Sequence, residues 1–124
     1  YENPFHTTEE RTSHWMEILR EFSSTEIDFN GLEQYREIAW QRQLHLFEVP
    51  FYYIEYGIAQ LGAIGMWKQF KENKEKALDN YMKALSLGGI KPLPELYTTA
   101  GLQFDFSPAY IKKLMEFVHT EMPE

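Results

Sequence analysis

A histidine and three tyrosines lie within the twelve positions from His45 to Tyr56, on either side of Pro50. Phenol groups donate hydrogen bonds to a developing oxyanion, and an imidazole does so when the facing nitrogen carries a proton. If the segment after Pro50 is helical, Tyr53 and Tyr56 are three residues apart and Tyr52 and Tyr56 four apart, so their hydroxyls would follow one helix face. These residue types suggest an oxyanion-binding site, although spacing alone favours large core residues with a polar tip.

The run from His45 to Trp67, HLFEVPFYYIEYGIAQLGAIGMW, resembles the C-terminal catalytic segment of oligoendopeptidase F-like zinc metallopeptidases, which are relatives of thimet oligopeptidase. The resemblance continues through ALDNYMKALSLGG (77–89), PELY (94–97) and AGLQFDF (100–106), and so covers most of the 124 residues. It implies an all-α fold that forms part of a larger helical metallopeptidase catalytic domain.

The same resemblance implies roles for the four residues of the cluster. In these enzymes a histidine and tyrosines line the substrate cleft and hydrogen-bond the scissile carbonyl as it becomes tetrahedral. By motif position, His45, Tyr56 and Tyr53 are the catalytic residues and Tyr52 binds substrate. The choice between Tyr52 and Tyr53 stays open, because the spacing from the histidine to the tyrosines varies among relatives.

The sequence departs from the family at the metal site. These peptidases bind zinc through a helical His-Glu-x-x-His pair and a further glutamate, and the glutamate between the histidines acts as general base. The four histidines here are His6, His14, His45 and His119, and no two are four residues apart. We therefore interpret the chain as a C-terminal piece of a longer zinc oligopeptidase that hydrolyses short peptides, with zinc in the longer protein and no metal in this piece.

Composition excludes several classes of protein. The net charge of −7 would repel a nucleic-acid backbone, and the sequence has no cysteine for disulfides or thiolate metal sites. It contains no apolar run near the 18 residues that a membrane-spanning helix needs, and we expect no signal peptide. We expect one domain over residues 1–124, without nucleic-acid or membrane partners and in the cytoplasm.

The hydrophobic period is helical almost everywhere, which predicts a compact bundle of five to six helices with a long central helix. The first should follow a capping box of Thr7 and Glu10, and the second should be capped by Asn30 and run towards His45, with Leu32, Tyr35, Ile38 and Ala39 on its inner face. A break is expected near residues 48–50, because proline disfavours the helix before it. The expected helices cover residues 8–22, 30 to about 45, 51–70, 76–87, a short segment before Gly101, and 108–119.

Other interpretations of the same residues are weaker. The small and aromatic positions of a tetratricopeptide repeat are matched by Gly65, Ala77, Tyr81 and Ala84. No second copy of this pattern occurs about 34 residues before or after it, which is the period of that repeat. Glu116-x-x-His119 occurs once, whereas a di-iron bundle needs two such motifs. The alternative function is a non-catalytic helical domain that binds a peptide or a partner helix. An uncovered aromatic face around the tyrosines would favour a homodimer.

Overall fold

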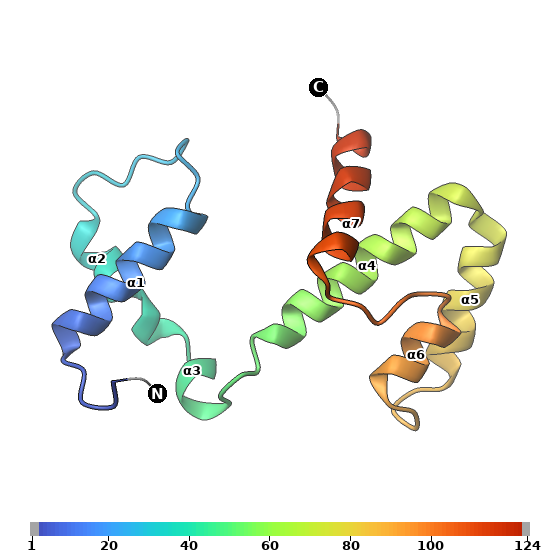
Figure 1. The fold of residues 1–124 in the computed structure, drawn as a ribbon, viewed down its shortest axis with the longest axis horizontal. Helices are drawn as coiled ribbons and strands as arrows, with labels where there is room; N and C mark the ends of the chain where they lie inside the picture. The colour runs from blue at the N-terminus through green and yellow to red at the C-terminus, as the bar shows by residue number, and fades with distance from the viewer. Residues whose placement is uncertain (1–2, 123–124) are drawn as a thin grey trace. The chain divides into compact units, whose positions relative to one another are not determined.

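The structure, a computed structural model, describes residues 3–122 and divides into two compact units, Tyr1–Tyr52 and Tyr53–Glu124. All regular elements in the described residues are helices, so the predicted all-α class is confirmed (Figure 1). No helix in this part of the chain is long and apolar enough to cross a membrane. The expectation of a single domain over residues 1–124 stays a prediction.

The first unit begins with α1, Thr8–Phe22, at the predicted bounds. The Thr7 hydroxyl accepts a hydrogen bond from the Glu10 backbone N–H at 3.2 Å, and the Glu10 carboxylate accepts one from the Thr7 N–H at 2.7 Å. Both bonds of a capping box are therefore present. They satisfy two groups that a helix start would otherwise leave unpaired.

The expected second helix is broken into three short pieces. These are α2, Glu33–Glu37, a 3-10 helix, Ala39–Arg42, and α3, His45–Glu48. The predicted Asn30 cap is wrong, since the N-cap position of α2 is Leu32, which makes no side-chain cap. The splitting of this one helix explains why the described residues contain seven α-helices rather than five to six.

A tertiary contact explains the break after α2. The Trp15 indole N–H donates a 2.9 Å hydrogen bond to the Arg36 carbonyl, which would otherwise accept a bond from a continuing helix. Trp40 in the following 3-10 helix is 7% exposed and is the one buried side chain among the described residues of this unit. The inner face predicted from Leu32, Tyr35 and Ile38 is wrong, because these side chains are 47–61% exposed.

The predicted break near residues 48–50 is confirmed. Helix α3 ends at Glu48, and the next helix, α4, begins at Ile54. Between them Phe51 has a φ of 67°, which is strained for a bulky residue. The backbone N–H of Tyr52 donates to the Val49 carbonyl at 3.1 Å and closes a tight turn around Pro50 and Phe51.

The second unit is built on α4, Ile54–Glu72, followed by α5, Lys74–Ser86, α6, Leu93–Thr99, and α7, Pro108–Glu121. Figure 1 shows α5 folding back from the end of α4, with α6 beside α5 and α7 crossing α4, in agreement with the packed pairs α4–α5, α5–α6 and α4–α7. The start of α7 is capped as predicted, because the Ser107 hydroxyl accepts from the Tyr110 N–H and Pro108 takes the first helical position.

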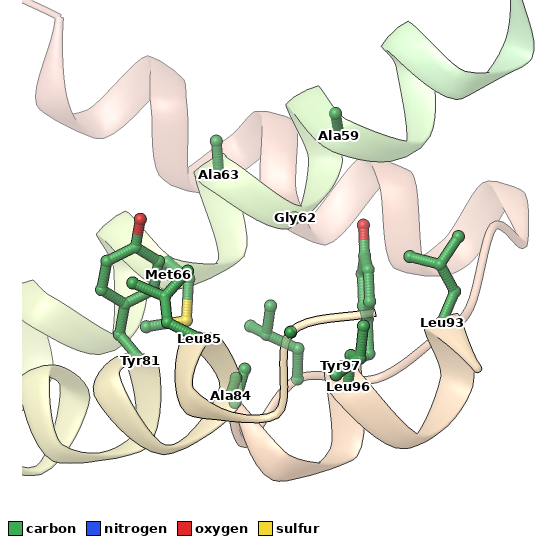
Figure 2. A pocket seen from close by; sticks show the side chains of 13 residues that line it. Ala59, Gly62, Ala63, Met66, Tyr81, Ala84, Leu85, Leu93, Leu96 and Tyr97 are labelled. Carbon is green, nitrogen blue, oxygen red and sulfur yellow. The ribbon is translucent and has the colours of Figure 1, made fainter. Parts of the chain in front are cut away.

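Helix α4 is long and central to its unit, as predicted, but it is not buried. Among its residues only Gly65 is buried. The remaining buried side chains of the unit are Ala77, Ala100 and Leu114. Helices α5 and α7 pack most extensively against α4, and α6 contacts it through Tyr97, which lines a pocket between α4, α5 and α6 (Figure 2), yet every residue of α4 except Gly65 keeps some exposure to solvent.

Two amide side chains, Gln69 of α4 and Asn80 of α5, lie against the end of α6. Gly101 has a φ of +73°, and its carbonyl accepts a 2.9 Å hydrogen bond from the Gln69 side chain, which also donates to the Ala100 carbonyl at 3.1 Å. A Cβ at Gly101 would lie 2.7 Å from the Asn80 amide nitrogen. Glycine is therefore required both by the left-handed conformation and by the close approach of this side chain.

Tyr97 joins α6 to α4. Its hydroxyl donates a 2.6 Å hydrogen bond to the Ile58 carbonyl, and Gly62 leaves room for it, since a Cβ there would lie 2.6 Å from the same oxygen. Burial, and secondly the nearby Tyr110, raise the pKa of Tyr97 above its usual value. The folded state therefore binds this proton more tightly than the unfolded state does.

We expect Tyr97→Phe to lower the free energy of unfolding by about 1 kcal/mol at neutral pH, because it removes one hydrogen bond. The stabilisation from the raised pKa is complete below the unfolded pKa of about 10 and is lost as the pH rises through the folded pKa. Urea titrations from pH 7 to 11 should thus show a steeper alkaline loss of stability for the wild type than for Tyr97→Phe. Parallel curves for the two proteins would contradict this role of the hydroxyl.

Candidate functional site

His45 and Tyr52 form a stacked pair in the first unit. Their ring centroids are 5.4 Å apart and the ring planes are inclined by 16°. His45 is the first residue of α3 and is half-buried, while Tyr52 follows the turn at Pro50 and is 45% exposed. The turn therefore brings together two residues seven positions apart, and stacking restricts the orientation of the imidazole.

Tyr53 and Tyr56 form a second pair, at the start of the second unit. Their ring centroids are 5.6 Å apart with a tilt of 54°. Tyr53 is the N-cap residue of α4, with φ −58° and ψ −25°, and Tyr56 lies in the first turn. Both side chains are about half exposed, at 47% and 54%. Large core residues would be covered, so burial within this unit does not account for these tyrosines.

The structure modifies the expected row of three phenols. Because α4 begins at Ile54, Tyr52 lies outside the helix and does not occupy the position one turn before Tyr56. Tyr53 and Tyr56, three residues apart, are brought together as the helical spacing required. The catalytic roles of His45, Tyr53 and Tyr56, and the substrate-binding role of Tyr52, stay predictions.

The sequence did not indicate that Phe51 determines the backbone path of this region. Its positive φ forms part of the turn between His45 and Tyr52, and its side chain is 78% exposed. Strained backbone of this kind costs about 1–3 kcal/mol and tends to occur at functional sites. The only local signal was Pro50, which predicts a break but not a left-handed residue after it.

The described residues form no cluster of metal ligands. Among residues 3–122, no group of three His, Cys, Asp or Glu side chains could hold a metal ion. His119 and Glu116 lie on exposed positions of α7, and His14 pairs with Glu17 at 3.2 Å on the surface of α1. The described residues therefore do not fit a catalytic zinc site, which needs three protein ligands.

The sequence matches Peptidase family M3 over residues 1–116, so the chain belongs to this family of peptidases. A curated relative, described as an oligoendopeptidase F homolog from Borreliella burgdorferi, is 33% identical over 89 residues. The matched segment covers 71% of this chain but only 14% of that relative. No solved structure matches the chain significantly. The resemblance inferred from His45 to Trp67 is thereby confirmed at the level of the family.

Proposed function

We propose that this chain is the part of an M3 oligopeptidase that binds the peptide substrate and stabilises the oxyanion formed during hydrolysis. The observation that carries the proposal is the concentration of one histidine and three tyrosines within twelve positions of a sequence that matches a peptidase family over residues 1–116. We use "parent enzyme" for the longer polypeptide that would contain this sequence.

The chemistry of this segment is hydrogen-bond donation. As water adds to a peptide carbonyl, the C=O π bond opens and negative charge accumulates on its oxygen. A phenol O–H of Tyr56, together with Tyr53 or Tyr52, donates to that oxygen, and these bonds strengthen as the charge develops. His45 contributes an imidazole N–H whose orientation is restricted by its stacking on Tyr52. Donors fixed before the reaction lower the barrier without reorganising during it.

Zinc and the general base belong to other parts of the parent enzyme in this proposal. The described residues do not fit a zinc site, and no step above is assigned to a metal. The tyrosines and His45 act on the substrate oxygen alone. A cytoplasmic location and short peptides as substrates are parts of the same proposal.

The test is hydrolysis of short fluorogenic peptides by the purified parent enzyme. We expect turnover that is lost with a chelator and restored by zinc. A parent enzyme that carries stoichiometric zinc but cleaves none of a varied set of short peptides would contradict the proposed function.

The isolated 124-residue chain should bind no zinc stoichiometrically and cleave no peptide. Its histidines are scattered over the sequence, and a high-affinity site needs three ligands in a fixed geometry. Metal analysis after dialysis against micromolar zinc measures this directly. One equivalent of zinc retained per chain would contradict this prediction, because it would require a set of protein ligands in a fixed geometry.

The isolated chain should also associate or bind a hydrophobic dye through its aromatic face, defined as Tyr53 and Tyr56 at the start of α4. These two side chains are 47% and 54% exposed. Exposed apolar surface costs roughly 25 cal/mol per Å², which favours a symmetric dimer. Sedimentation at micromolar concentration, with and without dye, checks this. A monomer without dye signal would mean that the aromatic face is covered within the chain itself.

A further inference from the structure

The turn that follows α3 has the pattern of a type II β-turn. The Val49 carbonyl accepts a 3.1 Å hydrogen bond from the Tyr52 N–H, so Pro50 and Phe51 are the two central residues. The pyrrolidine ring of Pro50 fixes its φ near about −65°, and Phe51 has a φ of 67°. A negative φ followed by a positive φ is typical of type II. The second central position usually holds glycine, which has no Cβ to clash.

Phenylalanine is therefore an unfavourable residue for this position. Among the described residues, the other positive φ angles belong to Gly31, Gly88 and Gly101, so Phe51 is the one residue with a side chain in this conformation. A Cβ there lies too close to the following carbonyl oxygen. Packing of the ring could offset this cost, but the side chain is 78% exposed. Neither the turn nor packing within the unit explains the presence of a ring.

The position of the ring in the chain indicates what it contacts. Phe51 directly precedes Tyr52, for which we predict substrate binding, and the Cα atoms of successive residues are about 3.8 Å apart. A peptide held at Tyr52 therefore lies within about one or two residues of Phe51. The ring carries no hydrogen-bonding atom, so the complementary group on the peptide is apolar. Strained residues are retained where they contribute to function.

We propose that Phe51 is a specificity-determining residue whose ring contacts an aliphatic or aromatic side chain of the peptide substrate. This inference rests on the proposed function, because it requires a peptide bound at the same segment. A contact between two apolar side chains is present in both the bound substrate and the transition state, so it affects KM and not kcat. In this respect Phe51 differs from His45 and Tyr56, whose removal should lower kcat.

Phe51→Gly in the parent enzyme tests the proposal, because glycine adopts the same φ without strain and removes only the ring. The substrates are fluorogenic peptides in which one position at a time carries phenylalanine or alanine. The wild type should prefer phenylalanine at one position. We expect Phe51→Gly to lower kcat/KM for that peptide about tenfold, through KM, and for its alanine counterpart by less than about threefold. The melting temperature should be unchanged or slightly higher.

Two further variants separate the ring from the backbone. Phe51→Ala also removes the ring but keeps the strain, so it should lose the same preference and melt at a lower temperature than Phe51→Gly. Phe51→Leu keeps an apolar side chain and should retain most of the preference for phenylalanine. Full preference in Phe51→Ala and Phe51→Gly would overturn the proposal and leave the proposed function intact.

Three other results would also contradict the role of Phe51. An equal fall in kcat for both peptides would mean that the residue positions the His45–Tyr52 pair and does not contact substrate. A lower melting temperature of Phe51→Gly than of the wild type would mean that the ring packs against the rest of the parent enzyme. A wild type that cleaves none of the peptides would contradict the proposed function itself, and this inference with it.

Discussion

Replacing Tyr56 by phenylalanine in the parent enzyme is expected to lower kcat by about a hundredfold or more, which is the usual effect of removing one oxyanion donor. Peptide binding should change little. The lost hydrogen bond forms mainly to the tetrahedral oxygen, so the change affects the transition state and not the ground state. His45→Ala should behave in the same way. Steady-state kinetics with one short peptide separates kcat from KM for both variants.

Tyr52→Phe and Tyr53→Phe provide the matched comparison in the same assay. Each removes one phenol oxygen from a side chain of nearly equal exposure, 45% and 47%. The variant with the larger loss in kcat identifies the second donor, and a change confined to KM marks the substrate-binding residue. Unchanged kcat in both Tyr56→Phe and His45→Ala would assign these residues to packing.

Leu114→Ala should lower the free energy of unfolding of the isolated chain by about 2–5 kcal/mol, the usual cost of a cavity at a fully buried leucine. Leu114 is 2% exposed and lies in α7, which packs against α4. The matched control is Leu85→Ala, because that leucine is 55% exposed in the same unit. Leu85→Ala should lower the free energy of unfolding by less than about 1 kcal/mol. Urea unfolding monitored by helical circular dichroism measures both, and equal losses would contradict the described core.

Helices with local start and stop signals could be predicted from sequence. The capping box of Thr7 and Glu10 predicted the bounds of α1, and Ser107 with Pro108 predicted the start of α7. Gly101 marked the end of α6 because only glycine readily adopts its positive φ. Each of these signals lies within a few residues of the element that it limits, so no tertiary information was needed.

The region from Asp28 to Arg42 could not be predicted, because distant residues decide its structure. The Arg36 carbonyl is bound by Trp15, 21 residues away, and no local pattern contains that contact. Asn30 resembled a helix cap, but its own N–H donates to the Asp28 carboxylate at 2.9 Å in a turn that precedes α2. Asp28 forms an Asx turn that places Asn30 in a loop two residues before the N-cap position of α2.

The choice of His45, Tyr52, Tyr53 and Tyr56 as site residues stays a prediction, and the geometry of these residues could be predicted only in part. The three-residue spacing correctly paired Tyr53 with Tyr56, since both follow the helical backbone at the start of α4. The stacking of His45 on Tyr52 depends on the left-handed conformation of Phe51, which its residue type would not suggest. The roles of these residues come from family membership and are not contained in the spacing.

The affinity of the parent enzyme for a phosphinic peptide, whose tetrahedral phosphinate mimics the oxyanion, tests the central claim most directly. If Tyr56 donates to the oxyanion, Tyr56→Phe should weaken binding of this analogue by about the same factor as it lowers kcat/KM, while binding of the matching substrate changes little. Equal affinity of the wild type and Tyr56→Phe for the phosphinate would contradict oxyanion stabilisation by this segment.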